Sequence, residues 1–296
     1  MSNSKPKLGL IGLGNMGGAM ARNLLEADYR LHVYDLDTEA VADCVSKGGI
    51  TTANTTDLVR QSDIVLTSLP SSSVFVGVAE ESFISNAKPD QVFIDLGTTE
   101  GEDTRRIAQA IAEKGATLLD APVSGGPAGA TSGNLRIFVG GEKDIFNQCK
   151  PILDILGEPE HVVYCGASGS GQTVKGVNQL AMGLGTTAYL EAIAYGVRAG
   201  INPKAIHQAV GGSIGWRHDI AQITQRIQDE RVETMVVKFP ELPYFLAEAN
   251  EQGITLPLTE ALFEFLDQEP RRWRDNMNRP TVSFWHTLLN HEREQS

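Results

Sequence analysis

The chain has 296 residues, of which 41% are hydrophobic and 21% are charged, and its formal net charge at pH 7 is −12. This composition is typical of a globular protein, and the length is enough for two domains with buried cores. The acidic balance disfavours nucleic acid and anionic membranes as partners, because both require a basic surface. A small anion can still bind where a few local donors outweigh the global field.

The cysteines and the apolar segments further restrict the kinds of protein that this chain can be. Cys44, Cys149 and Cys165 are odd in number and lack CxxC spacing, which argues against a disulfide framework and against a zinc site. No stretch of about 18 apolar residues occurs, and no apolar signal region precedes the first predicted strand. We therefore expect a cytoplasmic protein with no metal site and no membrane partner.

A glycine motif follows the first predicted strand. The apolar run after Lys7 leads into Gly12-Leu-Gly-Asn-Met-Gly17, and a helical pattern follows. In this context G-x-G-x-x-G predicts dinucleotide binding. Gly12 permits the tight turn, Gly14 allows the backbone to approach a pyrophosphate, and Gly17 allows the helix to pack closely. The amino end of that helix then faces the diphosphate.

The second predicted strand ends in Asp35, which lies 18 residues after Gly17. A carboxylate at this place accepts hydrogen bonds from the adenosine-ribose hydroxyls and repels a 2′-phosphate. No arginine follows directly, so the sequence favours NAD over NADP. The alternative interpretation is that Asp35 only caps the next turn, together with Asp37.

Further alternation of strands and helices predicts a parallel sheet. Residues 63–70 and 91–97 each read as a buried strand that ends in small polar residues. The carboxyl ends of parallel strands form the ligand crevice, so Leu69, Pro70 and Thr98 are expected to border the cofactor. The predicted cofactor-binding residues are Gly12, Leu13, Gly14, Asn15, Met16, Gly17, Asp35, Leu69, Pro70 and Thr98.

Two later segments carry a family resemblance. Residues 116–127 end in Asp-Ala-Pro-Val-Ser-Gly-Gly-Pro, and residues 169–179 read Gly-Ser-Gly-Gln-Thr-Val-Lys-Gly-Val-Asn-Gln. With the glycine motif, they resemble the β-hydroxyacid dehydrogenase family, which includes 3-hydroxyisobutyrate dehydrogenase and tartronate semialdehyde reductase. Three motifs in order are more specific than any one of them. The Asn178-Gln179 pair is closer to the tartronate semialdehyde branch.

The resemblance implies residue roles in hydride transfer between NAD and a small β-hydroxyacid. Lys175 would be the general acid or base, since desolvation in a closing cleft lowers the pKa of a lysine toward neutrality. Ser124, Gly125 and Gly126 would hold the substrate carboxylate. Asn178, with Gln179 beside it, would position the substrate, and Thr98 would lie near the nicotinamide ribose. The alternatives are a plain glycine turn and a surface lysine.

The second half of the chain reads as all helix. We expect a Rossmann-type α/β domain over residues 1–165 and an all-α domain over residues 166–296, joined by a long helix from about 171 to 199. Small and apolar residues on nearly every face predict that this helix is largely buried, partly by a second subunit. A homodimer or homotetramer is therefore expected.

The resemblance weakens toward the C-terminus. Pro240 occupies the place of a family lysine near the cofactor, and Lys238 either replaces it or is a surface charge. Beyond Asp267, the glycine-containing C-terminus of the family is replaced by residues such as Arg271 and His286. These departures bear on the identity of the substrate more than on the type of reaction.

Two other functions remain open from the sequence. One is a dinucleotide-binding homologue without catalytic turnover, which Pro240 favours and the Lys175-x-x-Asn178 spacing disfavours. The other is an imine (C=N) reductase on a related scaffold, which leaves Ser124-Gly125-Gly126 without an explanation.

Overall fold

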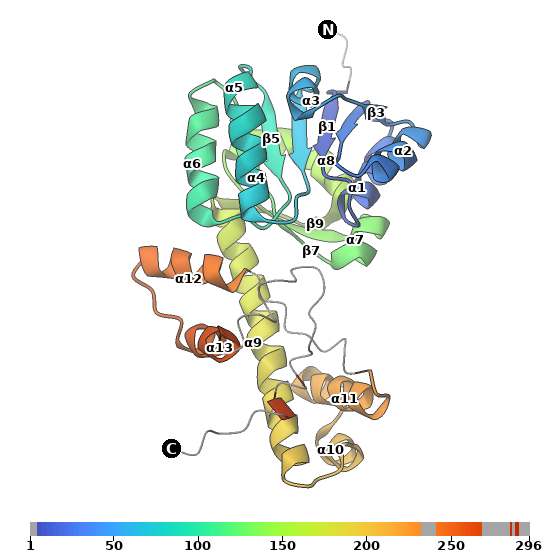
Figure 1. Ribbon diagram of the computed structural model, residues 1–296, viewed down its shortest axis with the longest axis vertical. Coiled ribbons are helices and arrows are strands. Elements are labelled where there is room, and N and C mark those ends of the chain that lie inside the picture. The colour runs from blue at the N-terminus through green and yellow to red at the C-terminus, as the bar shows by residue number, and fades with distance from the viewer. Residues whose placement is uncertain (1–4, 232–240, 268–284, 286–287, 290–296) are drawn as a thin grey trace. The chain divides into compact units, whose positions relative to one another are not determined.

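The computed structural model describes residues 5–231, 241–267, 285 and 288–289 (Figure 1). The chain divides into two compact units, Met1–Gly176 and Val177–Ser296.

The first unit is built on one sheet in which the strands run β3-β2-β1-β4-β5-β6-β8-β7, with β9 paired to β8. Strands β1 to β6 pair in parallel, β8 is antiparallel to β6 and β7, and β9 is parallel to β8. The bounds are β1 Leu8–Ile11, β2 Leu31–Tyr34, β3 Ile50–Thr51, β4 Ile64–Thr67, β5 Val92–Asp95, β6 Thr117–Asp120, β7 Val123–Ser124, β8 Leu135–Gly140 and β9 Gly157–Gly166.

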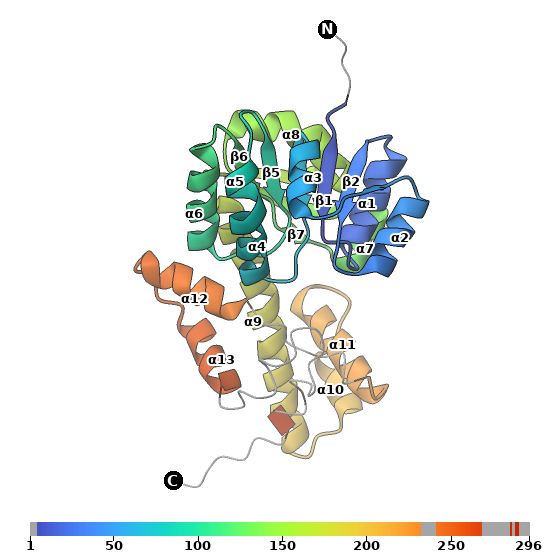
Figure 2. The same ribbon diagram turned by 45° about the horizontal axis from the view of Figure 1, so that its top comes forward.

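Helices cover both faces of this sheet (Figure 2). Alternate strand residues point to opposite sides, so Val92 and Ile94 join one hydrophobic cluster and Phe93 joins the other. The first cluster includes residues of α1, α7 and α8, and the second includes residues of α3, α4 and α6. The helices are α1 Gly17–Glu26, α2 Thr38–Ser46, α3 Thr55–Gln61, α4 Ser72–Val78, η1 Ala79–Phe83, α5 Ile84–Asn86, α6 Gly101–Ala112, α7 Gly126–Ser132 and α8 Lys143–Leu156.

The second unit is helical, and no strand follows β9 within the described residues. Its hydrophobic cluster includes Leu190, Ile220, Leu242 and Leu262. The Rossmann-type domain followed by an all-α domain is confirmed. The helices are α9 Ser170–Arg198, which begins in the first unit, α10 Pro203–Val210, α11 Gly215–Gln228, α12 Leu242–Glu251 and α13 Pro257–Asp267.

The long helix carries exposed apolar side chains. In the single chain Val177, Met182 and Tyr195 of α9 are 64%, 65% and 78% exposed. Small residues on every face permit close packing but do not by themselves supply a neighbour for each face. The burial of this helix in part by a second subunit stays a prediction.

The three motif glycines meet three different surroundings. Gly12 has a φ of +95°, a backbone conformation that residues with a side chain rarely adopt. A β-carbon on Gly17 would lie 2.0 Å from the carbonyl oxygen of Gly12, so α1 is packed against the turn at backbone distance. A β-carbon on Gly14 would meet nothing within 4 Å. Gly12 and Gly17 are thus constrained by the fold, whereas the fold leaves room at Gly14.

This contrast gives a matched pair of variants. Gly17→Ala forces α1 away from the turn, and we expect the unfolding free energy to fall by about 2 kcal/mol, as for other overpacked sites. Gly14→Ala should leave the unfolding free energy within about 0.5 kcal/mol of the wild type. Urea denaturation followed by circular dichroism measures both values. Equal losses in the two variants would contradict this assignment of the glycines.

Candidate active site

The glycine turn holds the side chain of Asp35. The backbone N–H of Leu13 donates to Oδ2 of Asp35 at 2.5 Å, and the N–H of Asp37 donates to Oδ1 at 2.8 Å. Asp35 thus has a structural role in the turn, while Asp37 caps α2 by accepting from Glu39 and Ala40. A carboxylate has about four acceptor sites, so Asp35 keeps capacity for further donors such as ribose hydroxyls. This geometry, with the open space at Gly14, fits a dinucleotide.

Three more predicted cofactor residues follow the carboxyl ends of neighbouring strands. Leu69 and Pro70 come after β4, and Thr98 comes after β5. Leu69 is half-buried, Pro70 is exposed and Thr98 is half-buried. Because β1, β4 and β5 are adjacent and parallel, these residues and the glycine turn lie along the same edge of the sheet.

A buried carboxylate orders the turn that contains Thr98. Asp95 is 1% exposed at the end of β5 and accepts from the hydroxyls of Thr67 at 2.8 Å and Thr99 at 2.7 Å. The N–H of Gly97 donates to the same carboxylate at 3.1 Å. Burial raises the pKa of Asp95, and these hydrogen bonds oppose the increase. The turn after β5 is therefore held from inside the protein.

A second buried carboxylate anchors the start of α9. Asp120, at the end of β6 and paired in register with Asp95, accepts from the N–H groups of Gly169 at 2.8 Å and Gln172 at 3.1 Å. Burial raises the pKa of Asp120 to about 6. A β-carbon on Gly171 would lie 2.3 Å from the carbonyl oxygen of Phe138, so the helix starts in backbone contact with the sheet.

The side chain of Gln172 connects these two anchors. Its Oε1 accepts from the N–H of Thr99 at 3.1 Å, and its Nε2 donates to the carbonyl oxygen of Gly97 at 3.0 Å. The turn with Thr98 and the first turn of α9 thus form one hydrogen-bonded assembly. Asp95, Asp120 and Gln172 were not predicted from the sequence. The available signal was an aspartate at the carboxyl end of two successive buried strands.

Lys175 lies one turn farther along α9 and is only 8% exposed. Its Nζ donates to the carbonyl oxygen of Val123 at 2.7 Å. Val123 precedes Ser124 in β7, so the structure brings the predicted proton-exchange group to the strand that carries the predicted carboxylate site. Lys175 is therefore not a surface lysine.

The segment after Val123 exposes its backbone. Ser124 is half-buried, and Gly125 and Gly126 have φ angles of +131° and +60°. A β-carbon on Gly126 would meet nothing within 4 Å. Consecutive glycines in this conformation present unhindered N–H groups, which suit an oxyanion.

Asn178 and Gln179 follow on α9, in the second unit. Three- and four-residue spacings place them on the same side of the helix as Lys175. Both are half-buried, and within the described residues the side-chain oxygen of Gln179 is buried without a hydrogen-bond partner. Lys238 and Pro240, like Arg271 and His286, lie outside the described residues.

Among the described residues, no group of three or more His, Cys, Asp or Glu side chains is arranged to hold a metal ion. None of the described helices combines the length and apolar character needed to span a bilayer.

Comparison with known proteins identifies the family. The sequence profile of the NAD binding domain of 6-phosphogluconate dehydrogenase matches residues 7–166. The profile described as the NAD-binding domain of NADP-dependent 3-hydroxyisobutyrate dehydrogenase matches residues 169–276. The 2-(hydroxymethyl)glutarate dehydrogenase of Eubacterium barkeri is 35% identical over 259 residues, which are 86% of this chain and 85% of the relative.

The chain belongs to the 3-hydroxyisobutyrate dehydrogenase family. The 3-hydroxyisobutyrate dehydrogenase of Pseudomonas aeruginosa is 34% identical over 212 residues, 70% of each chain. The fold matches that of the Mycobacterium tuberculosis 3-hydroxyisobutyrate dehydrogenase, with a TM-score of 0.79 over 96% of this chain and 98% of the other at 23% identity. This family member is an oxidoreductase with a nicotinamide adenine dinucleotide as cofactor, and the predicted resemblance is confirmed.

The raised pKa of Asp120 predicts a pH-dependent stability. Between its unfolded pKa of about 4 and its folded pKa of about 6, the folded state holds a proton that the unfolded chain has released. Asp120 therefore contributes to the unfolding free energy below that pH range. As the pH rises through the range, the unfolding free energy should fall by about 3 kcal/mol. Asp120→Asn should lack this part of the slope in urea denaturation measured from about pH 4 to pH 7.

The matched control is Asp144→Asn, which changes an exposed carboxylate in the first turn of α8. Its pH profile should parallel that of the wild type. If Asp120→Asn retains the full wild-type slope while Asp144→Asn does the same, the proton linkage does not belong to Asp120.

Proposed function

We propose that this chain transfers a hydride between NAD and the hydroxyl carbon of a small β-hydroxyacid, with Lys175 exchanging the hydroxyl proton. The observation that carries this proposal is the buried Lys175 amine at 2.7 Å from the carbonyl oxygen of Val123, next to Ser124. The relatives named as 3-hydroxyisobutyrate and 2-(hydroxymethyl)glutarate dehydrogenases support the substrate class, because each named compound has a hydroxyl carbon near a carboxylate.

The first unit would hold the dinucleotide along the carboxyl edge of the sheet. The N–H groups of the turn at Gly14 would face the diphosphate, and Asp35 would accept from the adenosine ribose. Thr98, fixed by the Asp95 and Gln172 contacts, would border the nicotinamide ribose. The bound dinucleotide supplies a hydride acceptor when the alcohol is oxidised and a hydride donor when the aldehyde is reduced.

The substrate carboxylate would lie at Ser124, Gly125 and Gly126. The Ser124 hydroxyl and the two glycine N–H groups would donate to its oxygens. The hydroxyl proton would pass to the neutral amine of Lys175 during oxidation and return from the ammonium during reduction. Asn178, with Gln179 beside it, would orient the substrate by hydrogen bonds without exchanging a proton.

Removing the amine tests the proton transfer. We expect Lys175→Ala to lower kcat by roughly two to four orders of magnitude, the usual contribution of a positioned acid–base group. Asn178→Ala should cause a smaller loss, shared between kcat and KM. The wild-type rate of alcohol oxidation should rise with pH, and this limb should vanish in Lys175→Ala. Steady-state kinetics after a screen of small hydroxyacids measure these effects.

NAD affinity is the control for both variants. It should barely change in Lys175→Ala, because the dinucleotide contacts come from other residues. Near-normal turnover of Lys175→Ala with intact NAD binding would remove Lys175 from this role.

Asp35 predicts the choice of dinucleotide. Asp35→Asn removes the charge that repels a 2′-phosphate and weakens the acceptor for the ribose hydroxyls. We expect the ratio of kcat/KM for NAD to that for NADP to fall by about tenfold or more. A wild-type enzyme that already prefers NADP would contradict our use of Asp35. Asp37→Asn, which changes the α2 cap, is the matched control.

We also propose that the chain forms at least a homodimer, as a dimer or a tetramer. The exposed Val177, Met182 and Tyr195 on α9 support this, since a second copy of the chain could bury apolar side chains that this chain leaves uncovered along one helix. Light scattering at micromolar concentration should give at least twice the chain mass of 32.0 kDa. A monomer at that concentration would contradict the proposal.

The other functions differ in their measurable outcome. Imine reductases share the fold, with a TM-score of 0.63 at 17% identity for that of Myxococcus stipitatus, which is a likeness of fold alone. A screen of hydroxyacids and cyclic imines with NAD and NADH distinguishes a dehydrogenase from an imine reductase, and binding without turnover would indicate a non-catalytic homologue.

The cytoplasm is the compartment we propose, supported by the free thiols of all three cysteines.

A further inference from the structure

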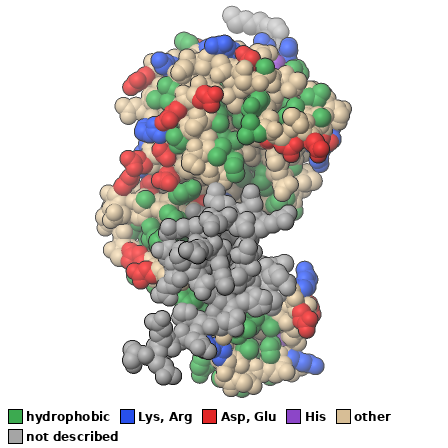
Figure 3. Space-filling model, in the orientation of Figure 1, with side chains coloured by type: hydrophobic (Ala, Val, Ile, Leu, Met, Phe, Trp, Pro, Cys, Tyr) green, Lys and Arg blue, Asp and Glu red, His purple; other side chains and the backbone are tan. Residues whose placement is uncertain are grey.

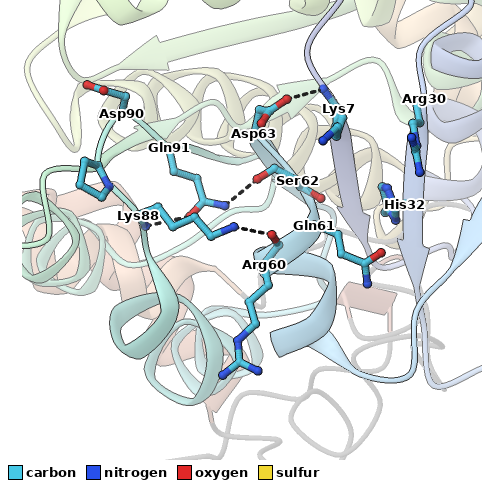
Figure 4. Close-up of a pocket in the computed structure, with 11 residues that line it drawn as sticks. Lys7, Arg30, His32, Arg60, Gln61, Ser62, Asp63, Lys88, Asp90 and Gln91 are labelled. Atoms are coloured by element: carbon cyan, nitrogen blue, oxygen red, sulfur yellow. Dashed lines mark hydrogen bonds between the residues drawn. The ribbon is translucent and has the colours of Figure 1, made fainter.

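A pocket of about 490 Å³ lies at the amino-terminal edge of the sheet, opposite the glycine turn (Figure 4). The residues that precede β1, β2, β4 and β5 line it, together with the end of α3. All of them belong to the first unit. Four cations, Lys7, Arg30, Arg60 and Lys88, line the pocket against two carboxylates, Asp63 and Asp90.

This local excess of cations contrasts with the rest of the chain, whose formal net charge is −12. In Figure 3, Lys and Arg side chains lie along the end of the first unit from which the N-terminal trace leaves, and Asp and Glu side chains are more frequent farther down the same face. A positive concavity on an acidic protein concentrates small anions from solution. Its volume is in the range of small-molecule sites.

Some of the polar groups in the pocket have structural partners. The Nζ of Lys88 donates to the carbonyl oxygen of Arg60, and the Nε2 of Gln91 donates to the carbonyl oxygens of Val59 at 2.7 Å and Ser62 at 2.8 Å. These donors satisfy the last carbonyl groups of α3. The side chains of Lys7 and Arg30, in contrast, form no hydrogen bond or ion pair with any described residue.

His32 is the unexplained group at the base of the pocket. It is 2% exposed, and neither ring nitrogen has a hydrogen-bond partner among the described residues. It lies two residues after Arg30 and is paired in register with Gly9 of β1, above which Leu58 and Ser62 fill the space that a side chain would take. Burial lowers the pKa of His32, and the charges of Arg30 and Lys7 lower it further.

A buried imidazole without a partner is costly, and an anion in the pocket would stabilise its protonated form through charge. An anion would also offset the repulsion that Arg30 and Lys7 exert on a protonated His32. The guanidinium of Arg30 can donate two parallel hydrogen bonds to an oxyanion, and Lys7 adds a point charge. The three groups together match a doubly charged oxyanion better than a single carboxylate.

We propose that this pocket binds the phosphate group of a small phosphorylated metabolite through Arg30 and Lys7, with the buried imidazolium of His32 adding positive charge beneath them. The volume exceeds that of inorganic phosphate, so room remains for an organic portion. The site is separate from the dinucleotide edge, because it lies at the opposite ends of β1 and β2.

Sulfate and inorganic phosphate are suitable probes, measured by isothermal titration calorimetry on the full chain. We expect saturable binding to the wild type and at least about tenfold weaker binding to Arg30→Gln, because a charge-assisted contact is lost. Lys7→Gln should also bind more weakly. Lys7 and Arg30 are exposed and directly precede β1 and β2, and Arg226→Gln and Lys204→Gln are matched controls on exposed residues of the second unit.

Sulfate keeps two charges across the working pH range, so a pH effect on its affinity reports on the protein. We expect tighter binding as the pH falls and His32 is protonated, and loss of this dependence in His32→Phe. The other charged groups that line the pocket are Lys7, Arg30, Arg60 and Lys88, with the carboxylates Asp63 and Asp90. The imidazole NMR signals of His32 should shift on titration with sulfate.

Two results would overturn the proposal. One is the same weak, unsaturable response in the wild type, Arg30→Gln and Arg226→Gln, which would indicate a general salt effect. The other is displacement of sulfate by NAD, which would locate the anion at the dinucleotide edge. Binding should persist in Lys175→Ala, so the outcome does not depend on the proposed catalytic role.

Discussion

The position of Lys175, the proposed proton-exchange group, depends on one buried interaction, in which Asp120 accepts hydrogen bonds from the N–H groups of Gly169 and Gln172 at the start of α9. A carboxylate at the end of a buried strand is unfavourable unless donors surround it. The first N–H groups of a helix have no partner within the helix, so they supply the donors that the buried carboxylate needs. Asp95 is paired in register with Asp120 and accepts hydrogen bonds from Thr67, Thr99 and Gly97. The two carboxylates therefore hold the turn after β5 and the start of α9 together.

This arrangement links the two functional regions of the first unit. Gln172 fastens the turn that contains Thr98 to the first turn of α9, and Lys175 follows one turn later with its amine against Val123. The proposed dinucleotide edge and the proposed proton-exchange group are therefore fixed by the same hydrogen bonds. In a site built in this way, short polar contacts to strand ends perform the positioning.

The sequence predicted the parts of the site that have local signatures. The glycine motif and Asp35 follow from a strand–turn–helix pattern, and Lys175 and Ser124 follow from the family resemblance. Asp95, Asp120 and Gln172 were not predicted, because their partners are distant in sequence and an aspartate after a strand also suits an ordinary turn. The composition of α9 predicted burial in part by a second subunit, but composition does not reveal which faces of the helix the chain itself covers.

Buried polar groups at the two edges of the sheet differ in whether they have hydrogen-bond partners. At the carboxyl edge, Asp95 and Asp120 find their donors within the protein. At the amino edge, His32 is equally buried but has no partner among the described residues, and the nearby charges of Arg30 and Lys7 disfavour its protonation. Ordinary strand residues at this position, such as Leu or Val, would avoid both costs. A polar group retained where an apolar one would fold more easily is explained most simply by a ligand, and the surrounding cations define that ligand as an anion.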